Sequence, residues 1–302
     1  MTKLVFVRGA HALAAVMLAG STAVFAESSP TNISASLTLL QHVESDLDAG
    51  GEAGFTGVFA TVGGLWTRGP RSSLGLKLKI DFEDWNFDHV GGFGGATPWG
   101  DLYRVGLSVP YGYVTEGGWR LGLTPTVEYS GEADARLSDA LEYGATVTAA
   151  RRIRSDLTLG FGVGVYARIE ETSLFPFLMV DWRITDRLRL TNPLVAGPTG
   201  PAGLELSYAL NSGWEVGMGA AYRSYRHRLD RDGPFPGGVG ENRYIPVFVR
   251  VGREFSETLK INLYAGAAMD STLRVEDANG NRLYEEDQDP AAMLGLSLSG
   301  RF

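Results

Sequence analysis

The chain alternates apolar and polar residues with a period of two over most of its length. Between Leu74 and Glu83, every even-numbered residue is large and apolar and every odd-numbered residue is glycine or charged. The same alternation recurs in 119–129, 157–169, 259–267 and 292–302. Because successive side chains of a strand point to opposite faces, each segment predicts a strand with one apolar and one polar face.

The length of these segments and the placing of their aromatic residues favour a membrane barrel over a soluble sheet. Strands of soluble proteins usually have about 5 or 6 residues, whereas these run for about the 10 residues that a tilted strand needs to cross a bilayer. Trp119 and Tyr129 lie at the two ends of one apolar face, and Trp214 and Tyr222 at the ends of another. At ~3.3 Å per residue and a tilt of ~40°, each pair is separated by roughly 20 to 25 Å, which matches the apolar band of an outer-membrane barrel and its aromatic girdles.

The links between the strands alternate in length. Short links lie at 116–118, 155–156, 185–186, 211–213 and 256–257, and between them fall longer polar stretches at 84–100, 131–140, 228–242 and 271–290. Short turns at one end and long loops at the other are typical of outer-membrane barrels. We therefore predict an all-β fold: a transmembrane, antiparallel, up-and-down β-barrel of about 14 strands, with both termini at the short-turn end. The first two strands, starting near Ile33 and Phe55, are the weakest, and about 12 strands is the alternative without them.

The first 26 residues have the features of a secretory signal peptide. Lys3 and Arg8 precede a short apolar run, and small residues before the expected cleavage between Ala26 and Glu27 complete the pattern. We predict a signal peptide at 1–26, a barrel at 27–302 and a location in the cell outer membrane. Because the chain has no Cys, we exclude a lipid-modified cysteine and a disulfide framework.

Composition narrows the class further. Glycine accounts for 40 of the 302 residues, but without a Gly-X-Y repeat, which excludes collagen. A hydrophobic share of 44% is too high for a disordered chain. The net charge of -8 argues against a nucleic-acid partner.

Two stretches resemble known families. The alternating end 293–302, which finishes with Phe302, resembles the C-terminal strand by which the assembly machinery recognises outer-membrane barrels of Gram-negative bacteria. That resemblance implies the barrel-assembly machinery and outer-membrane lipid as partners. The segments 181–190, 197–206 and 222–224 resemble an uncharacterised family of bacterial outer-membrane barrels, a domain of unknown function, which implies a shape and a location but no substrate.

If the apolar faces contact lipid, the opposite faces line the lumen. The candidate lumen-lining residues are Lys77, Lys79, Arg104, Arg120, Glu128, Arg152, Arg168, Asp181, Arg183, Arg189, Arg223, Arg250, Lys260 and Arg301. One interpretation is a narrow, porin-like pore or binding channel for small polar or anionic solutes. The competing interpretation is that these charges pair across strands in a structural or adhesive barrel that acts through its acidic external loops. Both a narrow open pore and a loop-plugged lumen fit about 14 strands, and the sequence gives no signal for the oligomeric state.

Two inward-facing groups of residues are unusual for a polar lumen. Gly160, Gly162 and Gly164 follow one another on the polar side of their strand, where such glycines relieve crowding or mark the close approach of a ligand. Phe175, Phe177 and Met179 have the parity of lumen-facing residues in the next strand, an apolar patch that fits either a hydrophobic ligand or a bulge at Pro176.

The sequence evidence for a catalytic site is weak. His227 lies near Ser224 and Asp230, and His42 near Ser45, but no Gly-x-Ser-x-Gly motif is present and residues three apart on a strand point to opposite faces. We therefore expect no enzyme activity, with an outer-membrane hydrolase as the alternative.

The segment 277–281 has oxygen-bearing side chains around Gly280, as calcium loops do, but Asn-Gly is also a strong hairpin-turn signal. We predict a plain hairpin tip there, and we expect neither a metal nor a cofactor in this protein.

Overall fold

The structure is a computed structural model that describes residues 32–192 and 202–302. The predicted signal peptide and its cleavage site between Ala26 and Glu27 lie outside these residues. The strands are β1 (Asn32–Asp46), β2 (Glu52–Arg68), β3 (Ser72–Asp88), β4 (Leu102–Ser108), β5 (Tyr111–Val114), β6 (Trp119–Gly131), β7 (Leu141–Arg154), β8 (Leu157–Arg168), β9 (Glu171–Arg183), β10 (Leu188–Thr191), β11 (Gly203–Ala209), β12 (Trp214–Ala221), β13 (Arg223–Arg228), β14 (Val239–Ser256), β15 (Leu259–Glu276), β16 (Arg282–Gln288) and β17 (Ala291–Arg301), and the short 3-10 helix η2 (Leu137–Asp139) precedes β7.

These strands form one sheet that closes on itself, because β1 pairs with β2 along one edge and with β17 along the other. The strand pairings are antiparallel except for a single parallel one, in which Arg228 of β13 pairs with Gly131 of β6. Three wall strands are each interrupted once and appear as the pairs β4 and β5, β12 and β13, and β16 and β17. Pro110 and Pro290 lie at two of the interruptions, where a residue without an N–H cannot continue the ladder. The wall therefore has 14 strands, which confirms the predicted barrel and includes the two strands that the sequence indicated least strongly.

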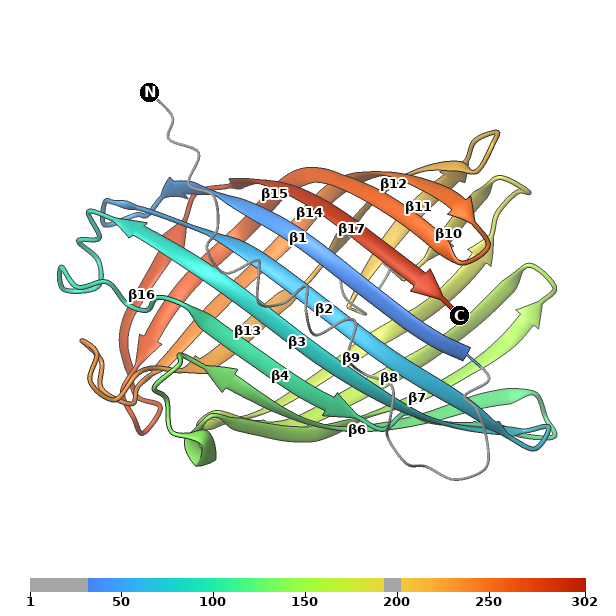
Figure 1. The fold of residues 1–302 in the computed structure, drawn as a ribbon, viewed down its shortest axis with the longest axis horizontal. Coiled ribbons are helices and arrows are strands. Elements are labelled where there is room, and N and C mark those ends of the chain that lie inside the picture. The colour runs from blue at the N-terminus through green and yellow to red at the C-terminus, as the bar shows by residue number, and fades with distance from the viewer. Residues whose placement is uncertain (1–31, 193–201) are drawn as a thin grey trace.

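The two ends of the barrel differ, as Figure 1 shows. One end, which we call the turn end, carries the short hairpin connections and the first and last described residues of the chain. There, the amide of Phe302 donates to the carbonyl of Ile33 at 2.8 Å, and the amide of Ile33 donates to the carbonyl of Phe302 at 2.9 Å. The opposite end, which we call the loop end, carries the connections 89–101, 132–140 and 229–238. Closure of the barrel thus extends to the terminal aromatic residue.

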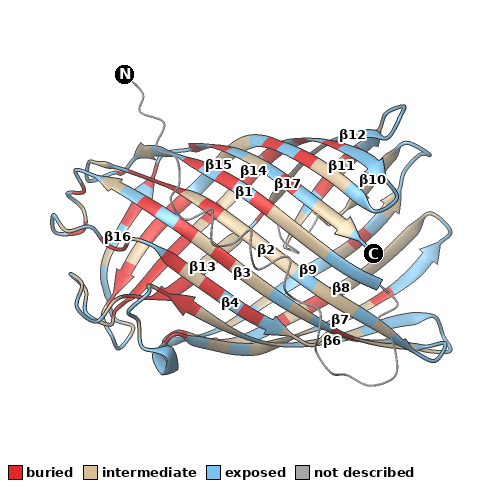
Figure 2. Ribbon diagram, in the orientation of Figure 1, coloured by how far each residue is buried: buried red, intermediate tan, exposed pale blue. Residues whose placement is uncertain are grey.

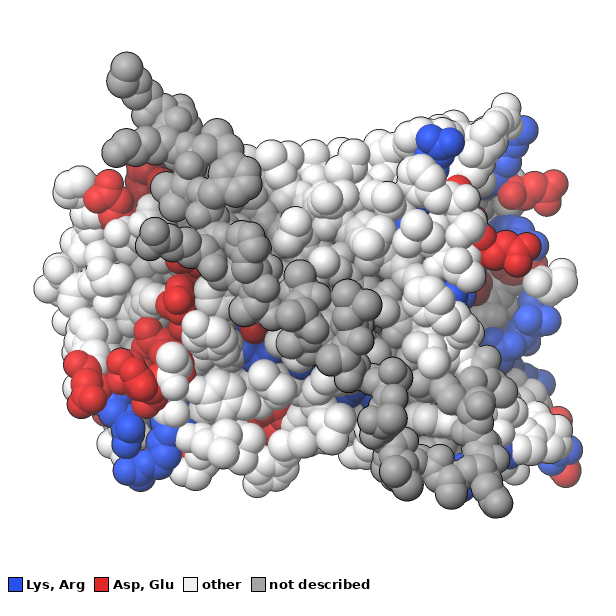
Figure 3. Space-filling model, in the orientation of Figure 1, with Lys and Arg blue, Asp and Glu red and all other residues white. Residues whose placement is uncertain are grey.

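The outer surface is apolar, as the period-two pattern predicts. On β3, Leu76 and Leu78 are about two-fifths exposed, whereas Asp81 and Glu83 on the opposite face are buried. On the face shown in Figure 3, charged side chains gather at the two ends of the barrel, and most of the surface between them is uncharged. A wall of this kind matches the outer surface of a transmembrane barrel. No helix of the described residues has the length and apolarity that a membrane-spanning helix requires.

The stretch 271–290, predicted as a long polar loop, is mostly strand. β15 continues to Glu276 and β16 returns from Arg282, so that a hairpin extends the wall beyond the apolar band. A positive φ of 51° at Asp270 accompanies a shift in parity, after which Leu273 and Val275 face the interior and are fully buried. The extension therefore has an apolar inner face and a polar outer face, the reverse of the membrane band. The prediction of a polar loop at 271–290 was wrong because it assumed that every strand has an apolar outer face.

An apolar core occupies the interior at the loop end, where Figure 2 shows most of the buried residues. We call this core the plug; it comprises Leu40, Leu47, Ala53, Phe55, Trp85, Val90, Phe93, Trp99, Leu102, Leu229, Tyr244, Ala268, Leu273, Val275, Ala291 and Met293. Its middle consists of rings at contact distance, with Trp99 edge-on to both Trp85 and Phe87 at centroid distances of 5.5 and 5.3 Å. The connection 89–101, predicted as polar, thus places Phe93 and Trp99 inside the barrel.

Glu132 ties two of the loop-end connections together. Its carboxylate accepts hydrogen bonds from the amide of Gly100 at 2.9 Å and from the amide of Asp230 at 2.7 Å. Burial raises the pKa of Glu132 in spite of these two donors. The segment that carries Trp99 is therefore fastened by side-chain contacts to neighbouring loops, outside the hydrogen-bond ladder of the wall.

Candidate functional site

The predicted lumen-lining residues lie on the inward faces of their strands. Arg104 and Arg250 are buried, Lys77, Lys79, Glu128, Arg168, Arg223 and Lys260 are half-buried, and Arg120, Arg152, Asp181, Arg183, Arg189 and Arg301 are exposed toward the turn end. Charge in the lumen therefore becomes more accessible to solvent from the plug toward the turn end. The structure divides these residues into two buried ion-pair networks and a basic region at the turn end.

The first network joins β3, β4 and β6 directly below the plug. Arg104 forms an ion pair with Glu83 and lies 3.4 Å from Asp81, its cross-strand partner. Lys79 bridges Asp81 at 3.2 Å and Glu128 at 3.0 Å. Buried charges require such pairing because an isolated one has a large desolvation cost. For these residues the cross-strand pairing that the sequence left as an alternative is what the structure contains.

The second network lies across the lumen on β11, β12, β14 and β15. Arg250 pairs with both Glu205 and Glu215, and its Nη1 donates to the Oδ1 of Asn262 at 2.8 Å. Lys260 reaches Glu215 at 3.3 Å. Every charged member of this group has an opposite charge beside it. The group therefore holds neighbouring strands of the wall together and leaves no free charge for a solute.

Arg168 and Arg189 each make one close ion pair. Arg168 lies 3.5 Å from Glu142 and donates to the hydroxyl of Ser224 at 3.1 Å. Arg189 donates to Asp181 at 2.8 Å, in a pair that is about half exposed. The second pair is open to solvent and is therefore weakly held.

The turn end of the lumen contains cations that the networks do not neutralise. Within residues 32–192 and 202–302, no hydrogen bond or close ion pair involves the side chains of Lys77, Arg120, Arg152 or Arg183. Arg183 lies directly opposite Arg189 in the register of β9 and β10. Like charges at directly opposed positions of a sheet repel one another. Arg120, Arg183 and Arg189 all act electrostatically on Asp181, the acidic residue between them.

The inward glycines and the apolar patch of β9 fit together. A Cβ on Gly162 would overlap the ring of Phe177, and a Cβ on Gly164 would overlap the ring of Phe175. The glycines therefore make room for rings of the adjacent strand, and Pro176 causes no bulge, because the β8–β9 register runs through it without a shift. Phe175 and Phe177 are half-buried and lie outside the plug.

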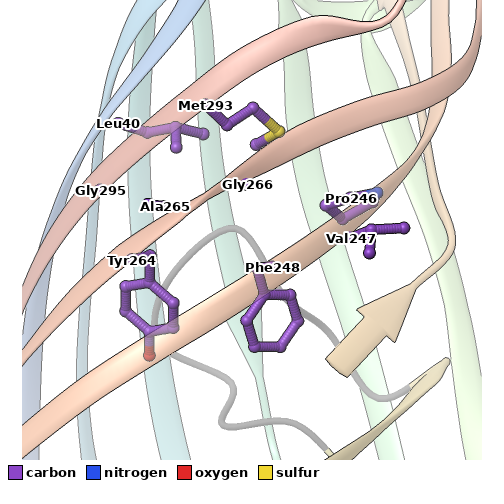
Figure 4. A pocket seen from close by; sticks show the side chains of 9 residues that line it. All are labelled: Leu40, Pro246, Val247, Phe248, Tyr264, Ala265, Gly266, Met293 and Gly295. Carbon is purple, nitrogen blue, oxygen red and sulfur yellow. The ribbon is translucent and has the colours of Figure 1, made fainter. Parts of the chain in front are cut away.

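A small hollow in the wall beside the plug is not a solute site. Figure 4 shows Phe248 and Tyr264 at its rim, with Leu40 and Met293 on the other side. The cavity measures about 10 Å³, room for about one water molecule at most. The two rings contact each other edge-on at a centroid distance of 5.8 Å, so that they close the wall at this level.

The residues considered for hydrolysis do not assemble into a catalytic group. The ring of His227 is edge-on to Trp99 at 4.7 Å, whereas the hydroxyl of Ser224 lies on the other face of β13 and donates to Glu241 at 3.1 Å. His42 stacks on Phe55 at 5.0 Å, and the hydroxyl of Ser45 donates to a backbone carbonyl.

In the 277–281 hairpin, the carboxylate of Asp277 is hydrogen-bonded within its own turn. Asp277 accepts hydrogen bonds from the amides of Asn279 and Asn281 at 2.8 and 2.9 Å, and from the side chain of Asn281 at 2.8 Å. The side-chain bond from Asn281, together with the two amide bonds, lowers the pKa of Asp277. These contacts organise a hairpin tip and leave the carboxylate engaged with its own turn.

A group of charged residues that the sequence did not single out fastens the loop end. Arg226 is almost fully buried and contacts Glu276 at 2.5 Å, Glu241 at 3.3 Å and Glu171 at 3.3 Å. Its Nε also donates to the carbonyl of Ile169 at 2.9 Å. Neither the period-two pattern nor a motif marks Arg226, because its carboxylate partners lie on three strands that are distant in the sequence, β9, β14 and β15.

The closed 14-stranded wall, its apolar exterior and its charged interior define an outer-membrane-type β-barrel. The chain belongs to the family described as Domain of unknown function (DUF6268), whose model matches residues 129–301. A comparison with curated proteins finds no match.

Among solved structures, the chain resembles the COG4313 outer membrane channel from Pseudomonas putida F1, with 11% identity, a TM-score of 0.49 and coverage of 91% of this chain and 97% of the other. It also resembles a Pseudomonas aeruginosa FadL homologue, with 14% identity, a TM-score of 0.46 and 89% coverage of both chains. A third similar structure is the KdgM porin, with 9% identity, a TM-score of 0.37 and coverage of 88% of this chain and 99% of the other.

Proposed function

We propose that the protein is a gated outer-membrane channel that binds and passes a small anionic solute. The observation that carries this proposal is the pair Arg183 and Arg189, which face each other across β9 and β10 near the turn end of the lumen. Opposed like charges destabilise a sheet, and the carboxylate of Asp181 makes its close ion pair with Arg189 and not with Arg183. An anion between them offsets that cost, and two guanidinium groups offer the planar donors that carboxylate and phosphate groups accept.

The same proposal covers location and assembly. The turn end, with both ends of the described chain, faces the periplasm, as in other barrels with an even number of strands. The signal peptide delivers the chain across the inner membrane, and the last strand, which ends in Phe302, is the part that the assembly machinery recognises. The plug then lies at the external mouth and acts as the gate of the channel.

The competing candidate is a structural or adhesive surface barrel. The observations that favour it are the plug at the loop end and the ion pairs that buried Arg104 and Arg250 make with Glu83 and Glu205. In that case the basic residues at the turn end have no solute, and the lumen conducts neither before nor after the plug is loosened.

Ion selectivity in planar bilayers tests the proposal. We expect residues 27–302 to give unitary currents with an anion-selective reversal potential in a potassium chloride gradient. The double variant Arg183→Gln and Arg189→Gln then loses most of the selectivity. Arg253→Gln is the control, because Arg253 lies near the same end but stacks on Trp214 at 5.0 Å outside the lumen.

Three results contradict the proposal. One is a cation-selective current, and another is selectivity that survives neutralisation of Arg183 and Arg189. The third is a folded barrel that conducts neither as wild type nor with a loosened plug, which instead supports the structural alternative.

A further inference from the structure

The tryptophans outside the plug gather at the turn end of the outer surface. Trp119 and Trp214 are the first residues of β6 and β12, and both are 39% exposed. Trp66 and Trp182 lie close to the last residues of β2 and β9, next to the turns that follow. Such rings mark the depth at which the apolar layer of a membrane gives way to lipid headgroups. We call these four residues the tryptophan girdle.

Two rings of the girdle carry an arginine from the adjacent strand. Arg151 of β7 lies directly opposite Trp119, with its guanidinium carbon 5.9 Å from the centre of the ring. Arg253 of β14 lies opposite Trp214 in the same way, 5.0 Å from that ring and 4.8 Å from the ring of Phe255. A cation within ~6 Å of an aromatic face is attracted by the quadrupole of the ring. The same arrangement thus occurs on two separate walls of the barrel.

Both arginines face away from the lumen. On β7, Arg151 shares its face with Val147 and Ile153, which are exposed on the outer surface, and on β14 Arg253 shares its face with exposed Val249. Both arginine side chains are exposed, and in the part of the chain that the structure describes neither takes part in a hydrogen bond or a close ion pair. Stacking on a ring orients a guanidinium without occupying the N–H groups in its plane. Each arginine therefore presents its donors at the membrane surface.

The wall beside each arginine is apolar. Leu121 and Leu123 follow Trp119 on the outer face of β6. Val251 precedes Arg253 on the outer face of β14. A ligand that fits both parts carries an anionic group joined to a long apolar chain. A phosphate accepts paired hydrogen bonds from a guanidinium, whereas the ammonium group of a zwitterionic phospholipid is repelled by it.

At the loop end, the charges beside an outward-facing ring have the opposite sign. Tyr103 of β4 contacts Phe82 at a centroid distance of 5.2 Å. Asp84 and Asp101 act electrostatically on Tyr103, and both are exposed. An anionic headgroup is therefore repelled at this ring and attracted at the tryptophan girdle.

We propose that the tryptophan girdle binds anionic phospholipids at two sites, one formed by Arg151 and Trp119 and the other by Arg253 and Trp214. At each site the phosphate accepts hydrogen bonds from the guanidinium, and the acyl chains lie along the apolar wall. The ligand is a phospholipid of the membrane and not a soluble phosphate ester, because the apolar surface continues from each arginine. This inference concerns the outer surface and is independent of the solute that the channel passes.

Quenching of tryptophan fluorescence by brominated lipids tests this inference, because bromine quenches only the rings that it approaches closely. The protein carries Trp66→Phe and Trp182→Phe, which leaves Trp119 and Trp214 as the tryptophans of the girdle. It is reconstituted in phosphatidylcholine that contains either phosphatidylglycerol or phosphatidylcholine brominated near the start of the acyl chains. We expect phosphatidylglycerol to occupy the sites about fivefold more readily than phosphatidylcholine.

The double variant Arg151→Gln and Arg253→Gln then quenches equally with the two lipids, and each single variant loses about half of the preference. The matched control is Arg120→Gln with Arg152→Gln, which removes the same charge from sequence neighbours of Trp119 and Arg151 that face the lumen. We expect this control to keep the preference.

Four results overturn the inference. The first is equal quenching by the two lipids before the arginines are changed, and the second is a preference that survives the double change in a folded barrel. The third is an equal loss in the lumen-facing control, which means that only the total charge matters. The fourth is displacement of brominated phosphatidylglycerol by soluble glycerol phosphate, which makes the site one for a free phosphate ester.

Discussion

Removal of the Trp99 side chain is expected to open the channel. Trp99 is 2% exposed and lies in the middle of the plug, with Trp85, Phe87, Phe93 and His227 around it. It belongs to the connection 89–101, which is not part of the barrel ladder. Trp99→Ala therefore weakens the seating of this segment while leaving the hydrogen bonds of the wall in place.

The size of the effect follows from the burial of the ring. Truncation of a buried tryptophan to alanine costs about 3 to 5 kcal/mol. If the seated and displaced positions of the segment are two states, the lower value shifts their ratio by roughly 100-fold, because each ~1.4 kcal/mol is a factor of ten. A channel that is open for a small fraction of the time then becomes open about 100-fold more often.

Single-channel recording measures this shift directly. We expect Trp99→Ala to increase open probability, with the unitary conductance of the open state unchanged. Trp119→Ala is the matched control, because Trp119 is an exposed tryptophan on the lipid-facing surface near the turn end. An unchanged open probability in a folded Trp99→Ala barrel refutes the view that the plug is the gate, and so does an equal increase in Trp119→Ala.

Two further predictions concern stability. Glu83→Gln removes the carboxylate that pairs with buried Arg104 and is expected to lower the free energy of unfolding by about 3 to 5 kcal/mol, measured by urea denaturation in lipid vesicles; a loss below ~1 kcal/mol contradicts the pairing. Because the pKa of Asp277 is lowered, its ionised carboxylate stabilises the hairpin tip fully at pH values above the ordinary aspartate pKa. This stabilisation is lost as the pH falls through the lowered pKa. The amide of Asn281 should lose hydrogen-exchange protection over that interval in the wild type but not in Asp277→Asn, and identical profiles would contradict this assignment.

The barrel itself was predictable from sequence because the membrane imposes a single rule on the wall. Strands that face lipid outside and water inside must alternate, and the segment from Leu74 to Glu83 does so without exception. The alternating segments 119–129, 157–169 and 259–267 begin at the observed first residues of β6, β8 and β15.

The plug was not predictable in the same way, because the apolar residues of an alternating segment face the interior beyond the membrane band and face lipid within it. Leu273 and Val275 are apolar and face inward, whereas apolar residues within the band face outward. Trp99 is not part of any alternating segment, because it lies in a connection in which most of the other residues are glycine or polar. The interior contacts of such residues depend on which loops meet over the mouth.

For the candidate site, sequence parity placed the charged residues on the inner wall but could not separate paired from unpaired ones. Arg104 and Arg183 have the same parity signal, yet one is enclosed by Glu83 and Asp81 while the other faces Arg189. That difference depends on cross-strand register, which a stagger of two residues would change without altering either face. Register is set by the closure of the whole barrel.

The two halves of the proposed mechanism lie on different walls of the lumen. Strands β14 and β15 have 18 residues each and carry part of the plug, whereas β9 has 13 residues and carries Arg183. Because the long strands rise beyond the membrane band and β9 does not, displacement of the plug need not disturb the arginine pair at the turn end. Gating and ion selectivity should therefore be separable: Trp99→Ala should alter how often the channel opens, and the double variant Arg183→Gln and Arg189→Gln should alter which ions it favours.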